Sequence, residues 1–448
     1  MTNKKQLKDR IRARMAATGE SYSTARRHVL GLRPDDVPAP ARDAGYRLRG
    51  GQHPDSAVVT NLLAHHGVRL AATGAAPGEA LVLGVGGGLG AGYALWAHAP
   101  GGTPTPVLGF RNGWHYTGRW IRTALHRWGV PFDEQATSMA RRAADRLSAA
   151  LDVGEPAIVW PDRFRIGYRH LPPHLDGHGG HPVVAYGTTG DRVRLDDRNL
   201  APLTVPRERL DVARARVASY KNLLLVPRPD ADREVSDGQL RAAVRAGLVD
   251  CAEQLRHTSE SFSVPAWRAW SRLMTDRRDA RGWPRLFADR RGVTGALLAA
   301  WEGIEPAGTS GGNLRRLYAD FLTEAAALLD APALGDVAGA FAVAARGWHE
   351  VAEAAFPAGV PALARLRELT AQVNGGIIAD GDAGTAEVGS AAGRLWALRD
   401  RCDESPPLAA ADLAELFAAT GERLREVYHL EAAAVRRLHA AVADLPPA

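Results

Sequence analysis

The chain changes character near residue 231, and this change constrains the fold more than any other sequence feature. Between residues 45 and 227, short runs rich in Val, Ile and Leu are separated by turn residues, which is typical of strands. From about Ala231 onward, long Ala-, Leu- and Arg-rich stretches with helical spacing take over, as in 314–329 and 412–442. The pattern predicts an α+β domain over 45–227 and an all-α domain over 235–448.

In the first domain, a helix is expected to begin at Pro54, because proline is tolerated in a first helical turn, and to end at Gly67. Its apolar stripe consists of Val58, Val59, Leu62 and Leu63. Strands are expected at residues 157–160, 182–187, 192–196 and 222–226. The short turn Thr188 to Asp191 predicts that the strands at 182–187 and 192–196 are antiparallel neighbours.

The two ends of the chain lead to separate expectations. Residues 1–31 carry eight Lys or Arg and two acidic residues, which predicts a basic helical arm, followed by a linker over 32–44. Packing of the arm on the body is favoured over binding of nucleic acid or an acidic carrier protein. In the second half, helical spacing predicts four core residues: Trp283, Leu317, Phe321 and Trp348.

Composition indicates an ordinary folded protein of two or three domains. The chain has 448 residues, a net charge of +6 and 46% hydrophobic residues. Two cysteines, Cys251 and Cys402, cannot form a disulfide framework or a cysteine-based zinc site, so a reducing cytoplasm is expected. The longest uncharged run, 80–97, contains six glycines and predicts no membrane span, and no signal peptide is recognised.

Two further motifs predict neither a cofactor nor a metal. The glycines of 84–91 nominally match a dinucleotide fingerprint, but Arg111 stands about where an acid is required. Close approach of backbone to backbone or to a ligand is the favoured interpretation. The segment 170–181 contains His170, His174, His178 and His181 at loose spacing, which favours a polar loop over a structural zinc site.

The order of polar residues along the first domain suggests one kind of chemistry. A helix begins near residues 53–56, a later strand opens with His181, and the next strand ends at Asp196. Papain-like enzymes place a nucleophile at a helix N-terminus, a base on a later strand and an acid that orients the base. The same residue types at strand ends are often structural, so both interpretations stay open.

Several stretches resemble the N-terminal domain of the butirosin biosynthesis protein H family over residues 46–227. They read GGQHPDSAVVTNLLAHHG, EALVLGVGGGLGAGY, EPAIVWPDRFRIGY, HPVVAYGTTGDRVRLDD and SYKNLLLV. The stretches WPRLF, EPAGTSGGNLRRLYADFLTEAAALL and RGWHEVAE resemble the helical domain of unknown function that often follows it. The resemblance implies a papain-like fold and transfer of an aminoacyl group from an acyl carrier protein to an amine.

The resemblance also implies roles for individual residues. His181 would be the base and Asp196 its orienting acid. The predicted substrate-binding residues are His53, Asp55, Ser56, Asp162 and Tyr168. Three of these have structural alternatives, because His53 can cap the helix, Asp162 can cap a turn and Tyr168 can be a packing aromatic.

One departure from the family pattern bears on every functional interpretation. The family has a cysteine nucleophile after the histidine, whereas Pro54 follows His53 here. Ser56 cannot simply replace the thiol, because two helical positions are about 200° apart around the helix axis. Asp55 is about 100° away by the same geometry and is a poor acyl acceptor.

Two functions therefore remain. The first is direct acyl or aminoacyl transfer from a thioester to an amine in bacterial natural-product biosynthesis, with His181 as base. The second is a catalytically inactive homologue that binds a carrier protein, peptide or small molecule. The expected partners are an acyl carrier protein or peptide and a small-molecule amine; neither a membrane nor nucleic acid is expected, and a homodimer is left open.

Overall fold

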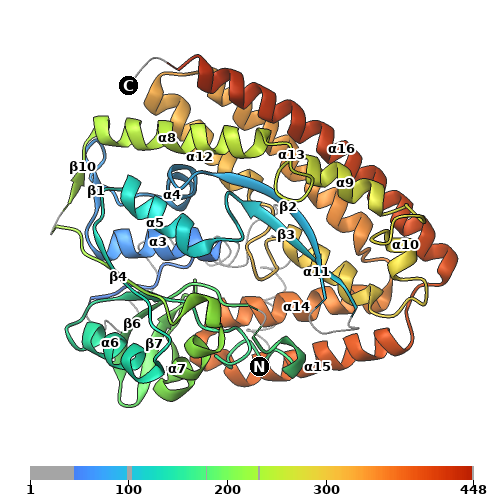
Figure 1. Cartoon of the computed structure of the whole chain (residues 1–448), viewed down its shortest axis with the longest axis horizontal. Coiled ribbons are helices and arrows are strands. Elements are labelled where there is room, and N and C mark those ends of the chain that lie inside the picture. The colour runs from blue at the N-terminus through green and yellow to red at the C-terminus, as the bar shows by residue number, and fades with distance from the viewer. Residues whose placement is uncertain (1–44, 98–102, 178, 231–232, 446–448) are drawn as a thin grey trace, which may run out of the picture.

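The computed structural model describes residues 45–97, 103–177, 179–230 and 233–445, so the predicted arm and linker lie outside the described residues. It has an α+β fold in which a sheet-containing part precedes a helical part. Figure 1 shows the helical part arranged along two sides of the first, with α16 (Ala410–Ala443) on one side and α14 (Pro361–Asp380) and α15 (Thr385–Glu404) on another.

The main sheet has six antiparallel strands in the order β4-β9-β5-β6-β7-β8. Their bounds are β4 Phe132–Gln135, β5 Ala157–Val159, β6 Val183–Thr189, β7 Arg192–Asp196, β8 Leu203–Pro206 and β9 Leu224–Pro227. The predicted pairing of the strands at 182–187 and 192–196 is confirmed by β6 and β7. Strands β4 and β8 were not predicted, because their sequences, FDEQ and LTVP, are not continuous apolar runs.

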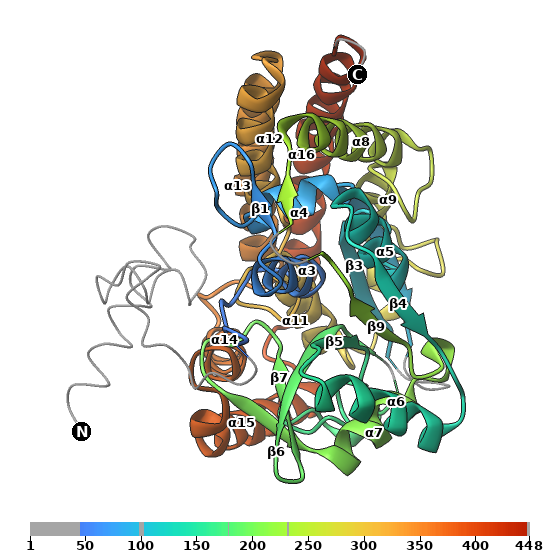
Figure 2. The same cartoon turned by 90° about the vertical axis from the view of Figure 1, so that its left-hand side faces the viewer.

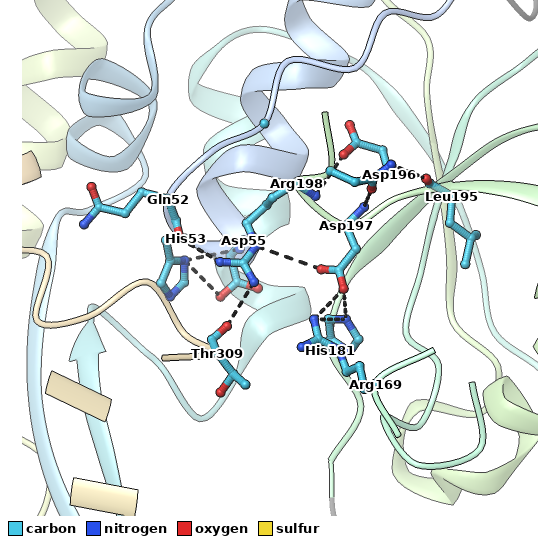
Figure 3. A network of polar contacts seen from close by, with 12 residues as sticks. Gln52, His53, Asp55, Arg169, His181, Leu195, Asp196, Asp197, Arg198 and Thr309 are labelled. Carbon is cyan, nitrogen blue, oxygen red and sulfur yellow. Dashed lines mark hydrogen bonds and ion pairs between the residues drawn. The ribbon is translucent and has the colours of Figure 1, made fainter. Parts of the chain in front are cut away.

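Helix α3 (Pro54–His65) begins at the predicted residue and buries its predicted apolar stripe. It contacts β6 as well as α4 (Glu79–Val85) and α5 (Thr117–Arg127). Helices α6 (Ala140–Asp152) and α7 (Arg207–Arg216) pack on the main sheet. The start of α3 thereby lies near His181, which stands just before β6, as Figure 3 shows. Figure 2 shows α3 above the strands of the main sheet.

The glycine-rich segment forms the end of α4 and the start of β2 (Leu89–Trp96). Strand β2 pairs antiparallel with β3 (Thr105–Arg111), and neither strand was predicted. This pair lies against the helical part, where it contacts α8 (Asp237–Arg256), α9 (Pro265–Leu273) and α11 (Val293–Ile304) (Figure 1). A Cβ added at Gly90 would lie 2.3 Å from the carbonyl oxygen of Arg111. The interpretation of these glycines as sites of close backbone approach is therefore confirmed.

The helical part contains no strand within residues 236–445, as predicted. Its other helices are α8 Asp237–Arg256, α9 Pro265–Leu273, α10 Trp283–Leu286, α11 Val293–Ile304, α12 Arg315–Leu329 and α13 Ala333–Ala355. Short elements complete the described chain: η1 Pro173–Leu175, η2 Ala218–Tyr220, η3 Gly381–Gly384, and the parallel pair β1 Arg69–Leu70 with β10 Glu234–Val235.

One hydrophobic core runs continuously through both parts. Trp283, Phe321 and Trp348 are fully buried, as predicted. The prediction for Leu317 was wrong: it is only partly buried, because the inward face of α12 is formed by Tyr318 and its neighbours one turn away. Both cysteines are buried, and no helix in the described ranges is long and apolar enough to cross a membrane.

Candidate functional site

His181 lies just before β6 and is almost completely buried. Its Nε2 is 3.1 Å from Oδ2 of Asp197 (Figure 3). The same oxygen also accepts a hydrogen bond of 2.8 Å from the Tyr168 hydroxyl. Arg169 forms an ion pair with the same carboxylate and places Nη2 3.2 Å from Nε2 of His181. Four side chains thus converge on one another inside the sheet domain.

The proton of His181 can be assigned from this geometry. A carboxylate only accepts and a guanidinium only donates, so a proton on Nε2 satisfies Asp197. The nitrogen Nδ1 is buried and has no hydrogen-bond partner among the described residues. A proton there would leave a buried donor unpaired, which is less favourable than an unpaired acceptor. His181 therefore presents a lone pair at Nδ1.

The predicted pairing of His181 with Asp196 is corrected by these contacts. Oδ2 of Asp196 accepts hydrogen bonds from the Tyr46 hydroxyl at 2.7 Å and from Nδ2 of Asn61 at 2.9 Å. Its other oxygen accepts from the backbone N–H of Arg198. Figure 3 shows the carboxylate of Asp196 directed away from His181, while that of Asp197 is directed toward it.

Burial determines the protonation of this cluster. It lowers the pKa of His181 to about 4, and Arg169 adds to this effect while Asp197 opposes it. Burial alone would raise the pKa of Asp197, but Arg169, His181 and Arg198 together bring it well below its usual range. At neutral pH the cluster therefore combines a neutral imidazole with an ionised carboxylate.

We expect the lowered pKa of His181 to make folding sensitive to acid. Between about pH 6.5 and 4 the unfolded chain binds a proton at this histidine and the folded chain does not, so stability falls as the pH falls. Between pH 7 and 5, the unfolding free energy of the parent should fall by about 1–2 kcal/mol more than that of His181→Gln. Urea unfolding of both proteins at each pH measures it, and a constant difference would contradict the shift.

The first turn of α3 is saturated by bonds within the protein. Nδ1 of His53 accepts the backbone N–H of Asp55 at 3.2 Å, so His53 caps the helix. Asp55 is buried and forms an ion pair of 2.7 Å with Arg111. Burial lowers the pKa of His53 to about 3, so it is neutral at ordinary pH.

Glu79 occupies the amide donors at this helix start. Its carboxylate accepts the backbone N–H groups of Gln52 at 2.7 Å and His53 at 2.9 Å, and the Ser56 hydroxyl at 2.8 Å. A carboxylate at a helix N-terminus is favourable because the helix dipole is positive there. The position where an enzyme would receive a substrate anion is therefore filled by the protein's own side chain.

Arg198 joins the helix start to the histidine cluster and to the helical part. Its guanidinium donates to the carbonyl oxygens of Gln52 at 2.7 Å and Thr309 at 3.0 Å, and lies 3.9 Å from Asp197 (Figure 3). Gln52 also donates to the carbonyl oxygen of Gly311. A loop of the helical part thus covers the N-terminus of α3.

The structure brings some predicted residues together and separates others. Tyr168 belongs to the His181 cluster, because its hydroxyl donates to Asp197. His53, Asp55 and Ser56 lie together at the start of α3. Asp162 instead caps a turn, because it accepts the backbone N–H groups of Phe164, Arg165 and Gly177. The polar residues that sequence analysis missed are Glu79, Arg111, Arg169, Asp197 and Arg198, which lie in no local motif that marks them as functional.

A cavity of about 460 Å³ lies beside the cluster, between the 163–179 segment and helices α11, α14 and α15. Arg169 lines the cavity and also contacts Asp197, whereas His181 is not part of its lining. His174 of the histidine-rich segment lines it as well. Within the described ranges, no group of three or more His, Cys, Asp or Glu residues is arranged to hold a metal ion.

The chain is thus an α+β protein in which proline begins α3 and a histidine just before β6 is paired with a carboxylate just after β7. Residues 53–198 match the model described as butirosin biosynthesis protein H, N-terminal, and residues 211–375 match a domain of unknown function, DUF4872. These two matches confirm the predicted resemblance to the butirosin biosynthesis protein H family and to the domain that often follows it. No curated protein matches it.

Proposed function

We propose that this protein binds an acyl or aminoacyl ligand of bacterial natural-product biosynthesis without turning it over. The ligand is bound as a free molecule, or while it is attached to a peptide or to a carrier protein. The observation that carries this proposal is Pro54 at the start of α3, which provides neither a thiol nor a backbone N–H. A papain-like mechanism needs a nucleophile, and its tetrahedral intermediate needs N–H donors directed at the oxyanion.

The surroundings of Pro54 support the same proposal. The amides of Gln52 and His53 are bonded to Glu79, and Asp55 is paired with Arg111. His181 has only 1% of its surface exposed, and its Nδ1 is buried. A substrate carbonyl therefore has no open approach to the histidine in this arrangement.

A second function, direct transfer with His181 as base, is favoured by one observation. The imidazole is neutral, is paired with Asp197 through Nε2, and has an unpartnered Nδ1 among the described residues. Such a nitrogen can take a proton from an amine that attacks a thioester. This function requires displacement of the groups that now bury Nδ1.

Restoring the thiol tests whether the site has lost more than its nucleophile. We expect Pro54→Cys to show no turnover of acyl thioesters with amine acceptors above that of the parent, because Glu79, Asp55 and Arg198 still fill the site. Turnover is followed by mass spectrometry on a panel of acyl N-acetylcysteamine thioesters. Pro54→Ser with the same panel is the matched control without a thiol.

Two results would overturn the binding proposal. Turnover in Pro54→Cys that disappears in Pro54→Cys/His181→Ala would mean that the catalytic geometry is intact and open. Turnover in the parent that falls by roughly 10²–10⁴ in His181→Ala would instead support direct transfer.

A further inference from the structure

We infer that the cavity beside the histidine cluster is a binding site for a small organic anion with an apolar body, held by Arg163 and Arg399. This inference deepens the proposed binding function and rests on it. The cavity volume of about 460 Å³ lies within the range of roughly 300–1,000 Å³ that is usual for small-molecule sites.

The two arginines come from different parts of the fold and are not neutralised by direct contacts. Arg163, in the sheet domain, has a buried Nε without a hydrogen-bond partner, and its guanidinium forms no ion pair with a described carboxylate. Arg399, on α15, stacks over the Trp396 ring at 5.2 Å and likewise forms no ion pair with a described carboxylate. Both line the cavity, so its walls present two cations with free donors.

The two acidic residues of the lining, Glu302 and Asp403, compensate the positive charge only in part. Burial raises the pKa of Glu302 to about 7, although Arg399 and Arg163 oppose the rise. Glu302 is therefore partly protonated at neutral pH and can donate a hydrogen bond to an anion. Asp403 lies one turn from Arg399 on α15 and interacts with it electrostatically, but the two side chains form no ion pair.

Other features of the lining fit a built site. Thr370 is 1% exposed, and its hydroxyl has no hydrogen-bond partner in the described structure. A Cβ added at Gly295 would lie 2.5 Å from Nη2 of Arg399, so this glycine within α11 leaves space for the guanidinium. Glycine inside a helix destabilises the folded state by about 0.5–1 kcal/mol relative to alanine. The space that the Arg399 guanidinium needs explains why glycine stands here.

The other side chains of the lining indicate that the rest of the ligand is apolar. The lining also has apolar and aromatic side chains, which are Leu171, Leu175, Val373, Leu395 and Trp396. An anionic group on Arg163 and Arg399 would leave the rest of the ligand against these side chains. A carboxylate and a phosphate ester both satisfy this chemistry, since guanidinium groups bind either in bidentate fashion.

Fluorine NMR titration of the full chain tests the inference with three probes: 4-fluorobenzoate, 4-fluorophenyl phosphate and uncharged 4-fluorobenzamide. We expect saturable binding of one or both anions and at least tenfold weaker binding of the amide. A preference between the anions would tell a free acid from a phosphate ester. Saturable binding of neither anion, or equal affinity for benzamide, would overturn the inference.

Variants locate the bound anion. Arg163→Gln and Arg399→Gln should each weaken binding of the preferred anion by about 10-fold or more, because a charge-assisted hydrogen bond is lost. Thr370→Val should weaken it several-fold and cannot harm folding through a lost bond. Exposed Arg394 on the same helix gives the matched control Arg394→Gln, which should bind like the parent.

The two proposals fail in distinguishable ways. Affinity for the anions that is unchanged in both Arg163→Gln and Arg399→Gln would overturn the anion site and leave the binding function standing for a neutral ligand. Turnover in the thioester assay would overturn the binding function, whatever the titration of the anions gives.

Discussion

Glu431→Gln is expected to lower the free energy of unfolding by about 3–5 kcal/mol, because it leaves a buried arginine without its counter-ion. Glu431 and Arg315 are both fully buried, and Nε and Nη2 of Arg315 donate to the two carboxylate oxygens at 2.6 and 2.9 Å. The indole N–H groups of Trp267 and Trp348 donate to the same two oxygens. A glutamine amide would turn an N–H₂ group toward donors that need an acceptor.

The ion pair also joins the glycine-rich strand pair to the helical part. Arg315 donates to the carbonyl oxygens of Gly90 on β2 and Phe110 on β3, and its guanidinium lies 4.8 Å from the Phe110 ring. Glu431 is on α16, so loss of the pair loosens α12, α16 and the strands at once. The destabilisation should therefore appear as one transition and not as local fraying.

Denaturant unfolding followed by tryptophan fluorescence measures the effect. The matched control is Glu368→Gln in the exposed pair with Arg365, where a loss of at most about 1 kcal/mol is expected. Should Glu431→Gln fail to fold, Arg315→Met/Glu431→Leu should recover folding, because an apolar pair leaves no charge unpaired. Equal stability of Glu431→Gln and Glu368→Gln would contradict the assigned role.

The parts of the fold that sequence predicted are those with a regular local pattern. Helix α3 was recognisable from its first-turn proline and apolar stripe, and β6 with β7 from a short turn between two apolar runs. The β2–β3 pair has no such pattern, because Leu89 to Tyr93 are buried on both faces and do not alternate. Its glycines admit large neighbours instead: a Cβ added at Gly92 would lie 2.3 Å from Nε1 of Trp114.

The choice of Asp196 over Asp197 failed for a different reason, which is a β-bulge. Near the turn, Thr189 pairs with Arg192 and Gly187 with Arg194. Continued without interruption, this register places Asp196 on the same face as His181. The register shifts by one residue between Ala185 and Gly187, which exchanges the faces and directs Asp197 toward His181. No residue type in β6 marks the bulge in advance.

Ion pairs and hydrogen bonds between residues far apart in the sequence could not be predicted from local patterns either. Arg111 pairs with Asp55, and Arg198 reaches Gln52 and Thr309, through contacts that exist only once the chain has folded. Likewise, the cavity is lined jointly by the sheet domain and three helices of the second part. The sequence resemblance pointed to a family and to His181 as a candidate site residue, but it could not predict these neighbouring residues.

Asp197→Asn is expected to destabilise the protein by about 3–5 kcal/mol, whereas Asp196→Asn should cost only about 1–2 kcal/mol. The carboxylate of Asp197 is the counter-ion of buried Arg169 and accepts from Tyr168 and His181, so its charge is needed. Asp196 is equally buried, but its partners are a tyrosine hydroxyl, an asparagine amide and a backbone N–H, all neutral.

Burial raises the pKa of Asp196 to about 6, in spite of its three hydrogen bonds, whereas that of Asp197 lies below its usual range. Relative to the unfolded chain, the folded protein therefore favours the ionised form of Asp197 and disfavours the ionised form of Asp196. Denaturant unfolding at pH 7 of the two single variants compares them in the same background. If Asp196→Asn costs as much as Asp197→Asn, or more, the charge compensation lies at Asp196 and the bulge does not set the partner of His181.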